Sequence, residues 1–121
     1  MLAACQSQGV TSPTPQTVIG TTPTTTTPIL PIVPAFRLKG DATAGQTIFT
    51  TNCGACHTLA AAGTTGAVGP NLDTLKPDYR TVTAQVTNGG ANMPPFKASL
   101  TAQQIADVAA YVVVSTGGTA P

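Results

Sequence analysis

The chain has 121 residues, which allows one domain of ordinary size. Hydrophobic residues make up 41% of it but aromatic residues only 4%, with no Trp, so we expect something other than bulky side chains to fill its core. Five Lys and Arg residues against four acidic residues give a net charge of +1, without a basic stripe or an acidic run. This balance argues against nucleic acid as a partner and predicts little electrostatic steering of a protein partner.

The first five residues end in Leu2-Ala3-Ala4-Cys5, which resembles the cleavage motif of bacterial lipoproteins, where the Cys is diacylated. Only four residues precede Cys5, whereas a signal peptide needs an apolar segment of about 7 to 15 residues, so we interpret residues 1 to 5 as the remnant of a signal peptide. The alternative is a free thiol, for which we see no structural use ahead of a spacer. We therefore predict that Cys5 is a lipidation site that anchors the protein to a membrane.

Residues 6 to 36 are predicted to form a linker. Between residues 11 and 34 there are nine Thr, six Pro and no charged residue, a composition that cannot bury enough apolar surface to fold by itself. We expect a disordered, extended arm that reaches roughly 95 Å at about 3.1 Å per residue. Residues 28 to 36 are apolar, and we prefer to interpret them as a strap on their own domain over a motif that binds a partner.

A mostly helical domain is predicted from residue 37 to residue 117, followed by a flexible tail over 118 to 121. Asp41 is placed to cap a first helix over residues 42 to 51, which ends at Asn52 or Cys53. A second, shorter helix over 78 to 86 is capped by Asp78 and stopped by Asn88-Gly89-Gly90.

The last helix has the clearest signals. Thr101 and Gln104 have the spacing of a capping box, and an apolar stripe follows at residues 105, 108, 109 and 112 before Gly117-Gly118 ends the helix. Two Gly- and Pro-rich loops, over 58 to 77 and 88 to 100, are long enough to need a rigid body on which to pack. A large planar cofactor would serve that purpose.

Cys53-Gly54-Ala55-Cys56-His57 is the C-x-x-C-H signature of covalent haem attachment. Two thiols one helical turn apart can each add to a haem vinyl group, which places the adjacent His57 imidazole at the iron as an axial ligand. The same five residues are less well explained as a thioredoxin-like dithiol, because the chain has no βαβ frame. A structural zinc site is weaker still, because it needs four ligands and only Cys5 remains.

The ligand on the opposite side of the iron is predicted to be Met93, in Asn92-Met93-Pro94-Pro95-Phe96. A lone Met is usually core filler. Here, however, only Met1 competes, the chain has no second His, and Met93 lies in a Gly/Pro-punctuated loop that prolines would stiffen. A thioether ligand favours ferrous iron and leaves no open coordination position, which is typical of an electron carrier.

Residues 40 to 116 resemble the class I, monohaem cytochromes c, most closely their small bacterial and photosynthetic members. The resemblance rests on motifs in a fixed order, which run from Gly45-Gln46-Thr47-Ile48-Phe49 through Cys53-Gly54-Ala55-Cys56-His57 and Gly69-Pro70-Asn71-Leu72 to Val86-Thr87-Asn88-Gly89-Gly90-Ala91-Asn92-Met93-Pro94-Pro95-Phe96 and Ile105-Ala106-Asp107-Val108-Ala109-Ala110-Tyr111-Val112. It implies an all-α fold, with three main helices and their loops wrapped around one haem c held by Cys53 and Cys56.

The resemblance also implies contacts inside the domain. The first and last helices should cross, with Gly45 and Phe49 against the face that carries Tyr111, since a close crossing needs a missing side chain. The Pro70 carbonyl should accept the Nδ1 proton of His57 and so fix the ring. Donors to the haem propionates do not transfer by motif, and the candidates are Lys76, Tyr79, Arg80 and Lys97.

These features predict a tethered one-electron carrier that is not an enzyme, has no small-molecule substrate and shuttles between redox protein partners. Because haem attachment by this motif is extracytoplasmic, we expect a periplasmic location or the outer face of a bacterial membrane. One alternative is a fixed haem subunit of a larger membrane complex. Another is a haem-based sensor or peroxidase, which is disfavoured because the chain lacks a second His, and no Arg is placed to polarise a bound ligand.

Overall fold

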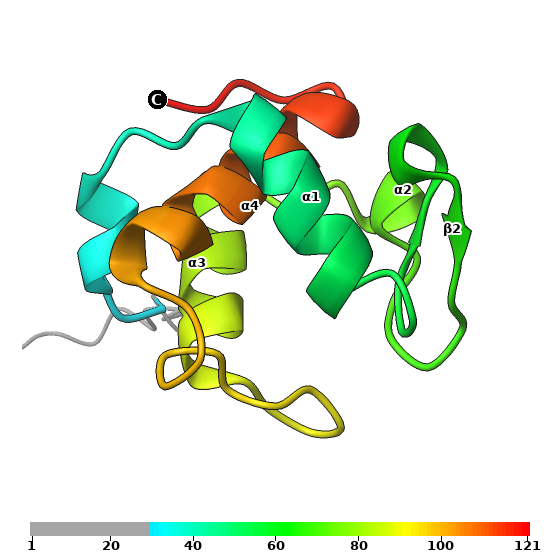
Figure 1. The fold of residues 1–121 in the computed structure, drawn as a ribbon, viewed down its shortest axis with the longest axis horizontal. Coiled ribbons are helices and arrows are strands. Elements are labelled where there is room, and N and C mark those ends of the chain that lie inside the picture. Colours follow the sequence, from blue (N-terminus) through cyan, green and yellow to red (C-terminus); the bar gives the residue numbers. More distant parts are fainter. Residues whose placement is uncertain (1–29) are drawn as a thin grey trace, which may run out of the picture.

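The computed structural model describes residues 30 to 121, and Cys5 and most of the predicted linker lie outside this range. As predicted, helices dominate: α1 (Ala42–Asn52), α2 (Leu72–Leu75), α3 (Tyr79–Asn88) and α4 (Ala102–Ser115), with the 3-10 turns η2 (Pro34–Arg37) and η3 (Ala60–Ala62). Two short antiparallel strands, β1 (Thr58–Leu59) and β2 (Thr64–Thr65), form a hairpin that the sequence did not predict. Figure 1 shows the hairpin and α2 together at one end of the molecule. Among the described helices none is both long and apolar enough to span a membrane.

Helix α1 crosses α4 at very close range, and this contact is the largest between elements of the fold (Figure 1). A Cβ atom at Gly45 would overlap the carbonyl oxygen of Asp107, so only glycine permits this approach. One turn further on, the rings of Phe49 and Tyr111 meet with their centroids 5.9 Å apart and their planes inclined at 59°. The helix crossing predicted from the family resemblance is therefore confirmed.

A buried carboxylate ties the start of α1 to α4. Asp107 is only 8% exposed, and its Oδ1 accepts hydrogen bonds from the backbone N–H of Asp41 at 2.8 Å and from Nε2 of Gln103 at 2.9 Å. The same Gln103 Nε2 also bonds the carbonyl oxygen of Lys39 at 2.9 Å. These bonds satisfy a buried charge that would otherwise be costly, and they fix where the chain enters α1.

The predicted helix caps are all present. The Asp41 side chain accepts from the backbone N–H groups of Thr43 and Ala44, and that of Asp78 accepts from Thr81. Thr101 and Gln104 form the reciprocal capping box at the start of α4. α3 extends two residues beyond its predicted end at 86, because it stops only where Gly89 adopts a φ of +67°.

Packing against the domain begins upstream of the predicted boundary at residue 37. Val33 is 6% exposed and Ala35 is 1% exposed, and both belong to the hydrophobic core. η2 lies against α3 and α4, as the strap interpretation predicts (Figure 1). The predicted flexible tail also makes contacts: Gly118 N–H donates to the Val113 carbonyl at 2.8 Å, and Ala120 packs on the core.

The segment between α1 and α3, predicted as an irregular loop, contains local structure held by side chains. Thr64 Oγ1 donates to the His57 carbonyl at 2.9 Å and accepts from the Leu59 N–H at 3.1 Å, which closes the hairpin. The Asn71 side chain caps α2 by accepting from Asp73 and Thr74. Asp73 in turn accepts from the Ala60 N–H at 2.8 Å and joins α2 to η3. These hydrogen bonds give the segment between α1 and α3 a defined structure, which supports the neighbouring Cys53, Cys56 and His57.

Candidate functional site

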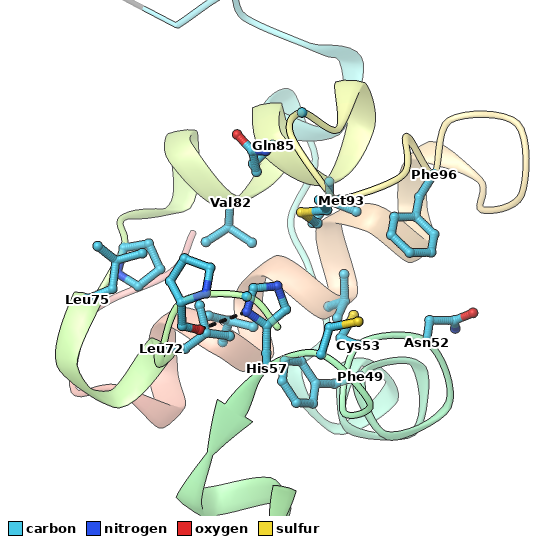
Figure 2. Close-up of a pocket in the computed structure, with 18 of the residues that line it drawn as sticks. Phe49, Asn52, Cys53, His57, Leu72, Leu75, Val82, Gln85, Met93 and Phe96 are labelled. Atoms are coloured by element: carbon cyan, nitrogen blue, oxygen red, sulfur yellow. Dashed lines mark hydrogen bonds between the residues drawn. The ribbon is translucent and has the colours of Figure 1, made fainter. Parts of the chain in front are cut away.

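A large cavity of about 440 Å³ opens between the helices, and its walls are mainly apolar. α1, α3 and α4 and the segment around α2 all contribute to it, and Figure 2 shows most of the residues that line it. The apolar part of the wall is formed by Phe49, Val68, Pro70, Leu72, Leu75, Pro77, Val82, Val86, Ala91, Pro94, Phe96, Val108 and Val112. Its size lies within the range of about 300 to 1,000 Å³ that is typical of cofactor sites.

The cysteine motif forms a tight turn directly after α1. The backbone N–H groups of Cys56 and His57 both donate to the Cys53 carbonyl, at 3.1 and 3.0 Å. This turn places Cys53, Cys56 and His57 on the cavity wall, with Cys53 buried and Cys56 exposed. Burial, helped by the neighbouring Cys56, raises the pKa of the Cys53 thiol to about 11. Both cysteines are free thiols, so each sulfur is available to form a thioether.

The His57 imidazole is held in one orientation from two sides. Its Nδ1 lies 2.9 Å from the carbonyl oxygen of Pro70, the contact that the family resemblance implies. A carbonyl can only accept, so the proton lies on Nδ1 and the Nε2 lone pair is left for another partner. Gly69 packs against the ring, since a Cβ atom there would lie 2.5 Å from Cε1. The Gly69 N–H in turn donates to the Cys56 carbonyl at 2.7 Å, which ties this loop to the motif.

Met93 lies on the opposite wall of the cavity from His57 (Figure 2). A pair of backbone hydrogen bonds closes its loop, from Gly90 N–H to the Met93 carbonyl at 2.9 Å and from Met93 N–H to the Gly90 carbonyl at 2.8 Å. The Phe96 N–H donates to the Val86 carbonyl at 2.9 Å and attaches the loop to α3. Gly89 carries a φ of +67°, and a Cβ atom there would lie 2.6 Å from the Met93 carbonyl oxygen. The thioether is therefore presented by a constrained loop.

The donor atoms in the cavity fit a covalently bound haem and fit a metal ion alone poorly. Two thiols, an imidazole with its Nε2 free and a thioether surround a space with apolar walls. Among residues 30 to 121 no cluster of three His, Cys, Asp or Glu side chains could hold a metal ion. A soft sulfur and a neutral imidazole are common axial ligands of haem iron. The cavity is thus a haem pocket of the c type.

None of the four residues considered as propionate donors lines this cavity. The Tyr79 hydroxyl donates to the Leu38 carbonyl at 2.7 Å, and the Arg80 guanidinium donates to the Leu30 carbonyl. Both side chains therefore bind the segment from residue 30 to residue 38, which contains the described part of the predicted strap. Lys76 and Lys97 are exposed and also lie outside the lining. The polar side chains that do line the cavity, besides His57 and the cysteines, are Asn52, Thr81, Gln85 and Asn92.

Sequence reasoning missed these polar residues, although a signal for two of them was present. Thr81, Val82, Gln85 and Val86 have the spacing of one helical face, and this is the face of α3 that lines the cavity. That this face points toward the cavity could not be predicted from the sequence, because the contacts of α3 with α4 and η2 are not local.

Comparison with known proteins agrees with the geometry. The sequence model of the family described as cytochrome c oxidase, cbb3-type, subunit III, matches residues 40–112. Cytochrome c6 from Rippkaea orientalis is 42% identical over 84 residues, which cover 63% of this chain and 72% of that protein. Cytochrome c6 from Leptolyngbya boryana is 40% identical over 77 residues, which cover 60% of this chain and 91% of that protein.

Two solved structures show the same fold. The c-type cytochrome SorU from Sinorhizobium meliloti has a TM-score of 0.60 and 44% identity, and the match covers 64% of this chain and 93% of SorU. Cytochrome c6 from the diatom Phaeodactylum tricornutum has a TM-score of 0.54 and 35% identity, and the match covers 64% of this chain and 95% of that protein. The chain belongs to the cytochrome c family, has the class I fold and carries a covalently bound c-type haem.

Proposed function

We propose that this protein is a one-electron carrier whose haem is attached through Cys53 and Cys56, with its iron ligated by His57 and Met93. The observation that carries the proposal is the placement of His57 and Met93 on opposing walls of one apolar cavity that also contains both cysteines. When bound, the haem supplies an iron centre that gains or loses one electron. The protein would accept an electron from a reduced partner and pass it to an oxidised one.

The residues around the cavity orient the ligands of the proposed haem and shield it from water. The Pro70 carbonyl, 2.9 Å from Nδ1, keeps the His57 proton on that nitrogen and directs Nε2 toward the cavity. Phe49, Leu72 and Val82 are buried and form dry walls that exclude water. Dry walls and two constrained ligand loops limit the rearrangement that accompanies a change of charge, and this suits repeated electron transfer.

The lining also bears on the sensor and peroxidase alternative. In the described part of the chain no Arg or Lys lines the cavity, and His57 is the only His in the whole sequence. Among the described residues, no cationic side chain on the Met93 side is therefore placed to polarise a bound peroxide or diatomic gas. The carrier accounts for the site better.

The test is the absorption spectrum of the purified holoprotein and of Met93→Ala. The wild type should show a low-spin spectrum with the weak ferric band at the red end of the visible range that reports a sulfur ligand. Met93→Ala should lose that band and bind external imidazole readily. Ser99→Ala, at an exposed position of the same loop that lies outside the cavity lining, is the matched control and should keep the band. A high-spin, five-coordinate wild type at neutral pH would contradict the ligation.

We further propose that the carrier works outside the cytoplasm and is tethered there by a lipid on Cys5, which lies outside the described residues. Its support is the lipoprotein-like motif and the uncharged Thr/Pro composition that follows it. Mass spectrometry of the intact native protein should show one haem and one diacylglycerol adduct. The adduct should be absent from Cys5→Ser, which should partition into the aqueous phase. A native mass without lipid would refute the tether and leave the haem assignment intact.

A second candidate function is a fixed haem subunit of a larger membrane complex, which the description of the matching family favours. Purification from native membranes in mild detergent distinguishes a fixed subunit from a free carrier. A subunit should co-migrate with a complex at constant stoichiometry, whereas a carrier should elute alone.

A further inference from the structure

α3 is a helix that its own sequence supports poorly. It has ten residues, Tyr79–Asn88, and half of them are β-branched Thr or Val. β-branched side chains lose rotamer freedom in a helix, and isolated helices shorter than about 12 residues are marginal in water. Tertiary contacts must therefore hold α3 in shape.

One set of these contacts comes from the haem pocket and another from the strap, which we define as residues 30 to 38. Val82, Gln85 and Val86 line the pocket. Tyr79 and Thr83 are buried and lie outside that lining. α3 thus lies between the haem pocket and the strap. α4 packs alongside it (Figure 1).

The strap is attached to the first turn of α3 by directed bonds. The Tyr79 hydroxyl donates to the carbonyl of Leu38 at 2.7 Å and lies 3.3 Å from that of Ala35. Arg80 donates through Nε at 2.9 Å and through its terminal NH2 at 2.6 Å to the Leu30 carbonyl. The guanidinium also lies 5.7 Å from the centroid of the Phe36 ring. The matching family model covers residues 40–112, so the strap lies outside the matched segment.

The other end of α3 carries the Met93 loop. The Val86 carbonyl accepts from the Phe96 N–H at 2.9 Å, and the Gln85 carbonyl accepts from the Gly89 N–H at 2.7 Å. Any loosening of α3 therefore reaches Met93 through two backbone bonds. By contrast, His57 is fixed by Gly69 and Pro70, which lie in the loop before α2 and are not part of α3.

We propose that the strap positions Met93: by clamping the first turn of α3 through Tyr79 and Arg80, it holds the helix that presents the methionine loop to the haem iron. The inference rests on the proposed ligation by Met93. It assigns Tyr79 and Arg80 as positioning residues, which act on the iron only through α3.

The test uses the full-length holoprotein with Tyr79→Phe and Arg80→Lys, singly and together. Both substitutions keep the net charge, and Phe keeps the aromatic ring. Imidazole competes with Met93 for ferric iron, so its apparent affinity measures how firmly the methionine is held. Since a hydrogen bond is worth about 1 kcal/mol, each single variant should bind imidazole up to about fivefold more tightly than the wild type.

A matched control separates positioning from general stability. Thr101→Ala removes the cap of α4, which should lower the melting temperature, and the hydrogen bond of the Thr101 side chain goes to Gln104 of α4 and not to α3 or the strap. Its imidazole affinity should match that of the wild type. If the strap variants bind imidazole no more tightly than Thr101→Ala at an equal loss of melting temperature, the strap is merely structural and the proposal is wrong. A wild type that lacks the sulfur-ligand band would instead overturn the Met93 ligation.

Discussion

Gly69 is predicted to be indispensable because it lies flat against the His57 ring. A methyl group at this position would lie 2.5 Å from Cε1, 2.9 Å from Nδ1 and 3.0 Å from Nε2. Carbon atoms in contact are normally about 3.5 to 4.0 Å apart, so the ring or the loop must move by about 1 Å. The ring cannot swing freely, since Nδ1 is bonded to the Pro70 carbonyl at 2.9 Å.

Gly69→Ala should therefore destabilise the holoprotein by about 1 to 3 kcal/mol, the usual cost of overpacking. For a domain of this size its melting temperature should fall by at least about 4 °C. Because the methyl group pushes on the imidazole itself, the ferric spectrum should change as well. Thermal unfolding followed by haem absorbance measures both effects.

Gly63→Ala is the matched control. Gly63 has a φ of +69°, so Ala there is strained by about 1 to 2 kcal/mol, but a Cβ atom would meet nothing within 4 Å. It should lower the melting temperature and leave the spectrum unchanged. An unaltered melting temperature and spectrum for Gly69→Ala would refute the tight contact with His57.

Two further predictions concern α3 and α4. Hydrogen bonding to Thr81, mainly to its backbone N–H, lowers the pKa of Asp78 in the folded protein. The stabilisation that this cap gives is therefore complete above the pKa of about 3.9 that Asp has in the unfolded chain. It is lost as the pH falls through the lowered pKa of the folded state. Asp78→Ala should cost about 1 kcal/mol in urea unfolding at neutral pH, and the difference from the wild type should vanish in acid; a constant difference would contradict this. The buried Tyr111 hydroxyl has no partner among the described residues, so Tyr111→Phe should leave stability unchanged or raise it by up to about 1 kcal/mol, whereas a larger loss would reveal a partner.

Most of the fold could be predicted from local signals. Asp41, Asp78 and Thr101 cap the three longer helices because a side-chain oxygen reaches a backbone N–H two or three residues away, and such bonds depend only on nearby sequence. The haem attachment motif is equally local, since its five residues fold into one turn. The hairpin was missed because strands of two residues are too short to show alternation.

The sequence alone thus determined the N-terminal caps of the three longer helices, the motif that attaches haem, and Met93 as the candidate on the other side of the iron. Only the tertiary structure decided what Tyr79 and Arg80 do. Their bonds reach residues 41 to 50 positions away in the chain, and no local pattern encodes such a partner. The same holds for Asp107, whose bond to Asp41 spans 66 positions. Long-range contacts arise from the packing of the whole chain. Because of that packing, Tyr79 and Arg80, which the sequence suggested as propionate donors, bind the strap instead.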